Sequence, residues 1–162
     1  MNLHLTKKVQ EKIKVTVDKA AYHSKECKFL EDWYVNIFTV NRKAYFIYTE
    51  AKTLYSIVKD AKGINCVSDF IDQTFLVIGE IYRKANVKIN LEELNSIYFN
   101  STNNKVVLGS QVDLIKMAKY QVWDNNDYNF EKINETPMSY ISTSPENEFE
   151  NEKRMHLNAT NA

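Results

Sequence analysis

Two apolar segments joined by a short polar linker constrain the fold of this chain more than any other feature. Residues 33–40 and 44–49 are almost entirely β-branched or aromatic, and Asn41, Arg42 and Lys43 separate them. Runs of this composition favour strands, and a short polar linker between two of them is typical of a β-hairpin. Apolar residues also occupy neighbouring positions rather than every second one. We therefore expect a hairpin that is buried on much of both faces.

The same patterns predict the elements around this hairpin. The expected strands are residues 2–5, 33–40, 44–49, 53–58 and 97–99. The expected helices are residues 7–14, 69–85, 91–94 and 110–122. Thr6 and Ser68 stand where N-caps would lie, and Ser110 with Asp113 matches the spacing of a capping box. The last helix is therefore expected to begin at Ser110.

These elements predict an α+β fold in a single domain over residues 1–123. The sheet is expected to be antiparallel, built on the central hairpin and packed with two or three helices. Residues 124–162 differ in composition, with eight acidic and three basic residues and isolated apolar positions. We interpret this segment as a polar, acidic and largely disordered C-terminal tail in which residues 138–141 dock back onto the domain.

Composition also limits the setting in which the protein works. No run of about 18 apolar residues is present, and the first residues are amphipathic rather than a signal sequence. The chain has two cysteines, Cys27 and Cys66, without the Cys and His spacing of a zinc site. We expect a cytoplasmic protein with no membrane association, no bound metal and no cofactor.

Charge is unevenly spread along a chain whose formal net charge is zero. Residues 1–62 carry twelve basic and seven acidic residues, whereas the remainder carries nine and fourteen. A basic N-terminal face could meet a phosphate backbone, and Tyr34, Tyr45 and Tyr48 could stack on bases. A solvated surface is the simpler interpretation, because the domain has no overall basic excess.

One group of polar residues predicts an anion site. Asn36 lies among apolar neighbours in the first hairpin strand, and basic residues occupy the turn. Gly109 and Ser110 stand at an expected helix start, where free N–H groups and the helix dipole attract anions. The candidate ligand-binding residues are Asn36, Arg42, Lys43, Asn104, Lys105, Gly109 and Ser110. The alternative is that Ser110 only caps the helix and the cations are solvated.

Catalytic motifs are missing from the sequence. No P-loop, dinucleotide-binding, zinc-protease or nucleophile-elbow pattern occurs. A base near a cation could still act on RNA or a nucleotide, and His4 or His23 with Arg42 is the combination that the sequence offers. His23 with Cys27 has helical spacing, but no third group to orient it is evident.

Three stretches, taken together, resemble a bacterial and phage family of short proteins classed as a domain of unknown function. The first is the strand, Thr-Lys-Lys and helix of residues 3–13, and the second runs from Trp33, Tyr34 and Asn36 through Arg42 to Thr53-Leu54-Tyr55-Ser56. The third is residues 104–110, Asn-Lys-Val-Val-Leu-Gly-Ser. Lys43, Tyr45, Lys105 and Val112 depart from the residues usual in that family. The resemblance implies a compact α+β fold and no known activity.

Three functions remain open at this point. The first is a non-enzymatic binding or regulatory module for a protein partner or an anionic ligand, with the acidic tail as a separable binding element. The second is a small enzyme acting on RNA or a nucleotide, of a toxin or phage-conflict type. The third is a structural homo-oligomer that associates through the tyrosine-rich hairpin. The sequence leaves the oligomeric state and the enzymatic status undetermined.

Overall fold

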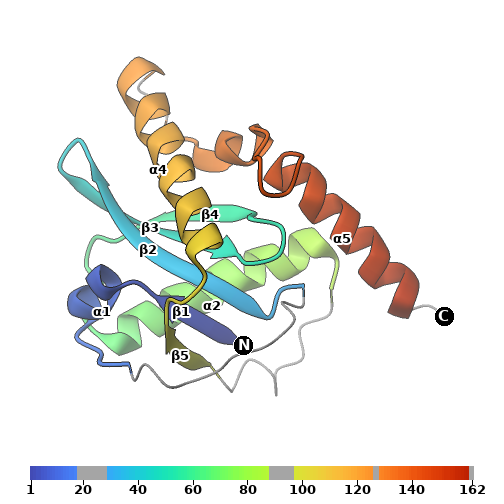
Figure 1. The fold of residues 1–162 in the computed structure, drawn as a ribbon. Coiled ribbons are helices and arrows are strands. Elements are labelled where there is room, and N and C mark those ends of the chain that lie inside the picture. Colours follow the sequence, from blue (N-terminus) through green and yellow to red (C-terminus); the bar gives the residue numbers. More distant parts are fainter. Residues whose placement is uncertain (18–28, 88–96, 126–127, 161–162) are drawn as a thin grey trace.

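A computed structural model describes residues 1–17, 29–87, 97–125 and 128–160, and it has the expected α+β class. Its five strands form one sheet in the order β4-β3-β2-β1-β5 (Figure 1). The strands are β1 (Asn2–Leu5), β2 (Asp32–Val40), β3 (Lys43–Glu50), β4 (Ser56–Asp60) and β5 (Tyr98–Ser101). The helices are α1 (Lys7–Ile13), α2 (Val67–Ala85), α4 (Lys105–Asn125), α5 (Pro145–Thr160) and the 3-10 helix η1 (Phe130–Glu135).

The predicted hairpin is confirmed as the centre of the sheet. Strands β2 and β3 pair antiparallel from Trp33 opposite Glu50 to Val40 opposite Lys43. Asn41 and Arg42 form the turn with φ values of 48° and 63°. A two-residue turn with positive φ at both positions matches the right-handed twist of the flanking strands. The turn is thus one residue shorter than expected.

The sheet is mixed, and the prediction of an antiparallel sheet holds only for β2, β3 and β4. Strand β1 pairs parallel with β2 on one side and with β5 on the other. The chain between β1 and β2 includes helix α1, and a connection of this length allows a parallel crossover. The alternation of Leu3 and Leu5 indicates a strand but carries no information about its direction.

Helices cover both faces of the sheet (Figure 1). Helices α1 and α2 pack on one face, where Val9 and Phe70 join a core containing Trp33 and Phe46. Helix α4 packs on the other face, where Leu114 and Ala118 join a core containing Tyr34 and Phe38. Because β2 contributes side chains to both cores, it is buried on both faces, as predicted.

The expected strand at residues 53–58 begins three residues later, at Ser56, because a tight turn precedes it. Glu50 is fully buried, and its carboxylate accepts hydrogen bonds from the backbone N–H groups of Lys52 and Thr53. Leu54 donates its N–H to the Glu50 carbonyl and adopts a φ of 61°. A buried carboxylate therefore holds residues 51–55 in a turn between β3 and β4.

The segment predicted as a disordered acidic tail folds onto the domain. Helices η1 and α5 lie within it (Figure 1), and Phe130, Ile133 and Phe149 are buried. Met138 docks back as expected, with 7% of its surface exposed. Phe130, Ile133, Met138 and Phe149 are spaced so that each reaches a core, which the average composition of the segment does not reveal.

Two remaining expectations concern other parts of the chain. The helix expected at residues 91–94 and the neighbourhood of His23 and Cys27 lie outside the described residues. Across the described ranges, no helix combines the length and apolar character needed to cross a lipid bilayer.

Candidate functional site

The start of helix α4 differs from the prediction and changes the candidate anion site. The helix begins at Lys105, five residues before Ser110. Asn104 caps it, because its side-chain oxygen accepts from the N–H groups of Val106 and Val107 at 3.0 and 3.3 Å. Gly109 and Ser110 thus lie within the helix, where the backbone N–H groups are already used by helical hydrogen bonds. The predicted capping box is wrong, and Asp113 pairs instead with Lys116.

The basic hairpin turn lies at the opposite end of β2 from this helix start. Tyr34, near the beginning of β2, donates from its hydroxyl to Asn103 at 2.8 Å, which fixes where α4 begins. Arg42 lies eight residues further along, or about 26 Å at the rise of an extended strand. Lys43 lies 5.2 Å from the ring centre of Tyr128. The predicted union of Arg42 with Lys105 and Ser110 is therefore not formed.

Asn36 is the predicted site residue that lies in a groove. Its side-chain oxygen accepts from the Thr6 hydroxyl at 3.2 Å and from the N–H of Ile37 at 2.8 Å. The side-chain NH₂ of Asn36 has no acceptor among the described residues and is free to donate to a ligand. Asn36 thus combines a structural role with an available donor.

Three lysines surround this groove, which has a volume of about 520 Å³. We call it the lysine groove, and it lies between α1, β2 and α4. Its lining residues are Lys8, Asn36, Ile37, Phe38, Thr39, Val112, Ile115, Lys116 and Lys119. In the described parts of the chain, no carboxylate lies within ion-pair distance of Lys8 or Lys119. The groove therefore presents unpaired positive charge beside a free amide donor.

An apolar surface continues from the lysine groove along α4. Lys116 and Lys119 also line a shallow depression of about 750 Å³, together with Met117, Tyr120 and Trp123. Tyr120 and Trp123 are 64% and 66% exposed. Exposed aromatic side chains next to one another often mark surfaces that bind proteins.

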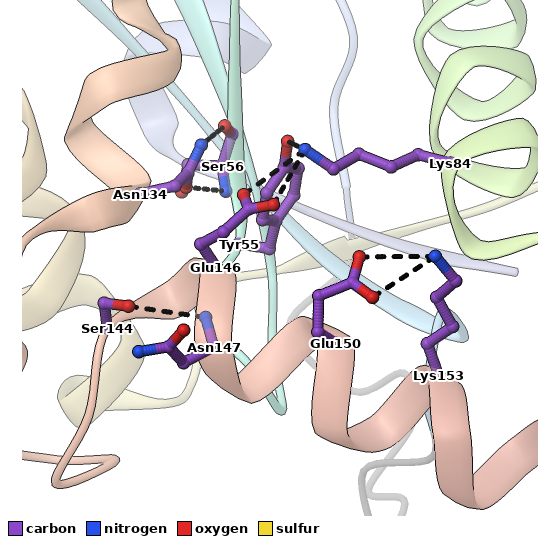
Figure 2. Close-up of polar contacts among 9 residues, drawn as sticks. All are labelled: Tyr55, Ser56, Lys84, Asn134, Ser144, Glu146, Asn147, Glu150 and Lys153. Carbon is purple, nitrogen blue, oxygen red and sulfur yellow. Dashed lines mark hydrogen bonds and ion pairs between the residues drawn. The ribbon is translucent and has the colours of Figure 1, made fainter.

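A second cleft of about 380 Å³ lies between β4, α2 and η1 and differs in its charge. Lys84 lies 3.0 Å from Glu146 and donates to the Tyr55 hydroxyl at 2.9 Å, as Figure 2 shows. Burial raises the pKa of Tyr55, and hydrogen bonds from Lys84 to Tyr55 and Glu146 overcome the effect of burial and raise the pKa of Lys84. Lys59 pairs with Glu80 at 2.8 Å. Because both lysines already have carboxylate partners, this cleft joins α5 to the domain rather than offering free charge.

His4 is part of a buried polar network and is not near Arg42. Its Nε2 lies 3.0 Å from the carboxylate of Asp32, and its ring stacks on Tyr34 with centroids 4.5 Å apart. His4 is opposite Tyr34 in the sheet, so it too is about 26 Å along the strand direction from Arg42. His4 and Arg42 cannot act on one phosphate. His4 is 4% exposed, which agrees with a structural residue of the sheet.

The contact between His4 and Asp32 should contribute measurably to stability. Replacing His4→Phe keeps a ring on Tyr34 but leaves the buried carboxylate of Asp32 without its donor, which should cost about 2 kcal/mol of unfolding free energy. Urea unfolding monitored by tryptophan fluorescence measures this change. In the double variant His4→Phe/Asp32→Leu the loss should be smaller than the sum of the single losses, whereas additive losses would show that the two residues do not interact.

Metal binding has no structural support in the described residues, where no group of three His, Cys, Asp or Glu side chains could hold an ion.

Sequence reasoning missed Lys8, Lys116 and Lys119, which come from distant parts of the chain. The spacing of Lys116 and Lys119 on one helix was a signal, but nothing in the sequence indicated that α4 crosses Asn36. Trp33 is buried and donates to the carbonyl of Leu30, in agreement with the burial predicted for the hairpin.

Comparison with known proteins identifies a family but no activity. A family model described as "Domain of unknown function (DUF6933)" matches residues 2–149. The match includes the three stretches that resembled such a family, and it extends past Trp123 into η1 and the start of α5. No curated protein matches the sequence.

Proposed function

The chain belongs to the DUF6933 family, and from that premise we propose that it is a non-enzymatic binding module whose lysine groove holds an acidic partner protein. The observation that carries the proposal is the arrangement of Lys8, Lys116 and Lys119 around the free amide of Asn36. Lys116 already pairs with Asp113 at 2.9 Å, whereas Lys8 and Lys119 have no carboxylate partner among the described residues. Unpaired cations beside a hydrogen-bond donor favour carboxylate groups, which accept hydrogen bonds with both oxygens.

The neighbouring apolar surface favours a protein over a small anion. Lys116 and Lys119 belong both to the lysine groove and to the depression that contains Tyr120 and Trp123. A partner that covers both would bury aromatic side chains at the centre of an interface with lysines beside them, an arrangement common in protein interfaces. A free phosphate or carboxylate would leave the aromatic side chains exposed.

The C-terminal segment has a different part in this proposal from the one expected of an acidic tail. Its acidic residues Glu146 and Glu152 pair with Lys84 and Lys52 of the same chain. These carboxylates are therefore engaged within the domain, and the partner's acidic groups would meet the lysine groove instead.

The thiol of Cys66 is free and exposed, which supports a reducing compartment such as the cytoplasm.

Reversing the groove charges should abolish binding of an acidic peptide. The probe is a fluorescein-labelled peptide of about ten residues that alternates Glu and Thr, followed by fluorescence anisotropy at low salt. The variant Lys8→Glu/Lys116→Glu/Lys119→Glu should bind at least about tenfold more weakly, because three attractive contacts become repulsive. The dissociation constant should also rise with salt.

A matched control separates the groove from the overall charge of the protein. Lys14, Lys62 and Lys105 are exposed and lie outside the lysine groove. The variant Lys14→Glu/Lys62→Glu/Lys105→Glu changes the net charge equally and should bind within about twofold of wild type. Equal weakening in both triple variants, or no binding by wild type, would refute the proposed function.

A further inference from the structure

The lysine groove contains a part of strand β2 that has a neighbouring strand on one side only, within the described part of the chain. Strand β1 ends at Leu5, opposite Val35, whereas β2 continues to Val40. The other side of β2 pairs with β3 along this whole stretch. Among the described residues, no strand pairs with residues 36–40 on the side that β1 has left, and we call this side the free edge of β2.

The direction of the backbone groups follows from the hydrogen bonds to β1. The backbone carbonyls of Glu31 and Val35 accept from the backbone N–H groups of Asn2 and Thr6. The backbone N–H and carbonyl groups of the odd-numbered residues of β2 therefore point toward β1. Ile37 and Thr39 continue this alternation past the end of β1. The N–H of Ile37 is taken by the side chain of Asn36. The carbonyl of Ile37 and both backbone groups of Thr39 have no partner in the described ranges.

We propose that an extended acidic segment of a partner protein adds to this edge of β2 as a further strand. An unpaired strand edge offers main-chain hydrogen bonds to an incoming strand, and the walls on either side select its side chains. Here the walls are α4, with Lys116 and Lys119, and the start of α1, with Lys8. Acidic side chains of the segment would pair with these lysines, while its backbone pairs with Thr39. This inference rests on the proposed function.

Two other occupants fit the groove less well. A second copy of this chain pairing edge to edge would bring the same three lysines of each copy together, and like charges oppose that contact. A nucleic acid would satisfy the lysines but would leave the Thr39 N–H and carbonyl without strand partners. The combination of free strand edge and positive charge favours an acidic peptide.

Backbone methylation of the peptide tests strand pairing without changing its charge. Two versions of the Glu-Thr peptide carry N-methyl groups on alternate residues, one on the glutamates and the other on the threonines. In a paired strand only one of these sets faces β2. One version should lose binding by about tenfold or more, and the other should bind within about twofold of the unmodified peptide.

Amide hydrogen exchange of the bound protein gives a second readout. The Thr39 N–H should exchange about tenfold more slowly when the unmodified peptide is bound. The N–H groups of Phe38 and Val40, which face β3, serve as internal references because pairing with β3 protects them in both states.

The outcomes separate this inference from the proposed function. If both methylated peptides bind like the unmodified one and Thr39 is not protected, while the groove lysines remain essential, strand pairing is wrong and the binding module stands. If the charge-reversed groove variant binds as wild type does, or if oligothymidylate binds while the peptide does not, both are wrong. Peptide-free dimerisation through the β2 edge would also overturn the inference.

Discussion

A protein truncated after Trp123 should fail to fold. This truncation removes η1 and α5, and with them Phe130, Ile133 and Phe149, all of which are buried. Replacing one buried Phe with Ala typically costs about 3–5 kcal/mol, and whole domains are stable by about 5–15 kcal/mol. Losing three such side chains at once therefore exceeds the stability that most domains of this size possess.

Polar contacts across the same boundary add to this expectation. Asn134 is 1% exposed and pairs with both backbone groups of Ser56, accepting from its N–H at 2.8 Å and donating to its carbonyl at 2.9 Å (Figure 2). The Asn134 side chain thus provides hydrogen-bond partners for backbone groups on the outer edge of β4. Removing it would leave the edge strand without those partners and expose the apolar face that η1 covers.

Circular dichroism and urea unfolding of the truncated protein test this prediction. The expected result is weak secondary structure with no cooperative transition, and Phe149→Ala alone should lower the unfolding free energy by about 3–5 kcal/mol. As a control, removal of residues 154–162 takes away mostly exposed side chains, so its cost should stay below about 1 kcal/mol. A cooperative transition after truncation at Trp123 would show that residues 1–123 form an independent domain.

The features predicted correctly from sequence are those set by local composition. The hairpin of β2 and β3 has strand-forming residues on both sides of its turn, so no distant contact was needed to identify it. Helix α1 likewise carries its two buried residues, Val9 and Ile13, at helical spacing. The family resemblance rested on such local stretches, and it is confirmed at the level of the family.

The start of α4 was missed because Ser110 and Asp113 match the spacing of a capping box, whereas Asn104 caps the helix. The apolar stripe of α4 gave no correction, because a buried polar residue interrupts it. Val107, Leu114 and Ala118 face the sheet, and Gln111 lies between them with no exposed surface. Its side chain donates to the carbonyl of Tyr34 at 2.9 Å and to the hydroxyl of Thr49 at 3.1 Å. A glutamine is expected at the core-facing side of a helix only where its amide finds hydrogen-bond partners, and the sequence does not show those partners.

The lysine groove could not be predicted for a related reason. Along the sequence, Lys8 comes before the central strands of the sheet and Lys116 comes long after them. Only the packing of α1 and α4 beside β2 brings the two lysines together. The early end of β1 creates the free edge, and the length of a neighbouring strand is decided by pairing rather than by the sequence of β2. The site is a property of the tertiary arrangement.

Replacing Glu50→Ala should destabilise the protein by about 4 kcal/mol, because each buried donor that loses its acceptor costs about 1–3 kcal/mol. Glu50 accepts hydrogen bonds from the backbone N–H groups of Leu30, Lys52 and Thr53 and from the Thr53 hydroxyl. These contacts join the end of β3 to the turn before β4 and to the residues before β2. The Ala variant removes every one of these acceptors and leaves a cavity.

The pH dependence of stability gives a second test of Glu50. Burial raises the pKa of this carboxyl above its ordinary value of 4.5, despite the hydrogen bonds that favour the charged form. Between the unfolded and folded pKa values the native state holds the extra proton, so the contribution of Glu50 to stability falls as pH rises through that window. Below pH 4.5 the carboxyl is protonated in both states, and its contribution is at its most favourable.

Urea unfolding of wild type and Glu50→Gln across pH 4 to pH 8 separates the two effects. Gln keeps the shape but places an NH₂ group against at least one donor, so it should cost about 2 kcal/mol near neutral pH. Since Gln does not titrate, the difference in unfolding free energy between wild type and Glu50→Gln should widen toward low pH. The exposed Glu135→Gln serves as control and should stay within about 0.5 kcal/mol of wild type. A gap between wild type and Glu50→Gln that narrows toward low pH would mean that the hydrogen bonds outweigh burial and that the folded pKa of Glu50 is lowered.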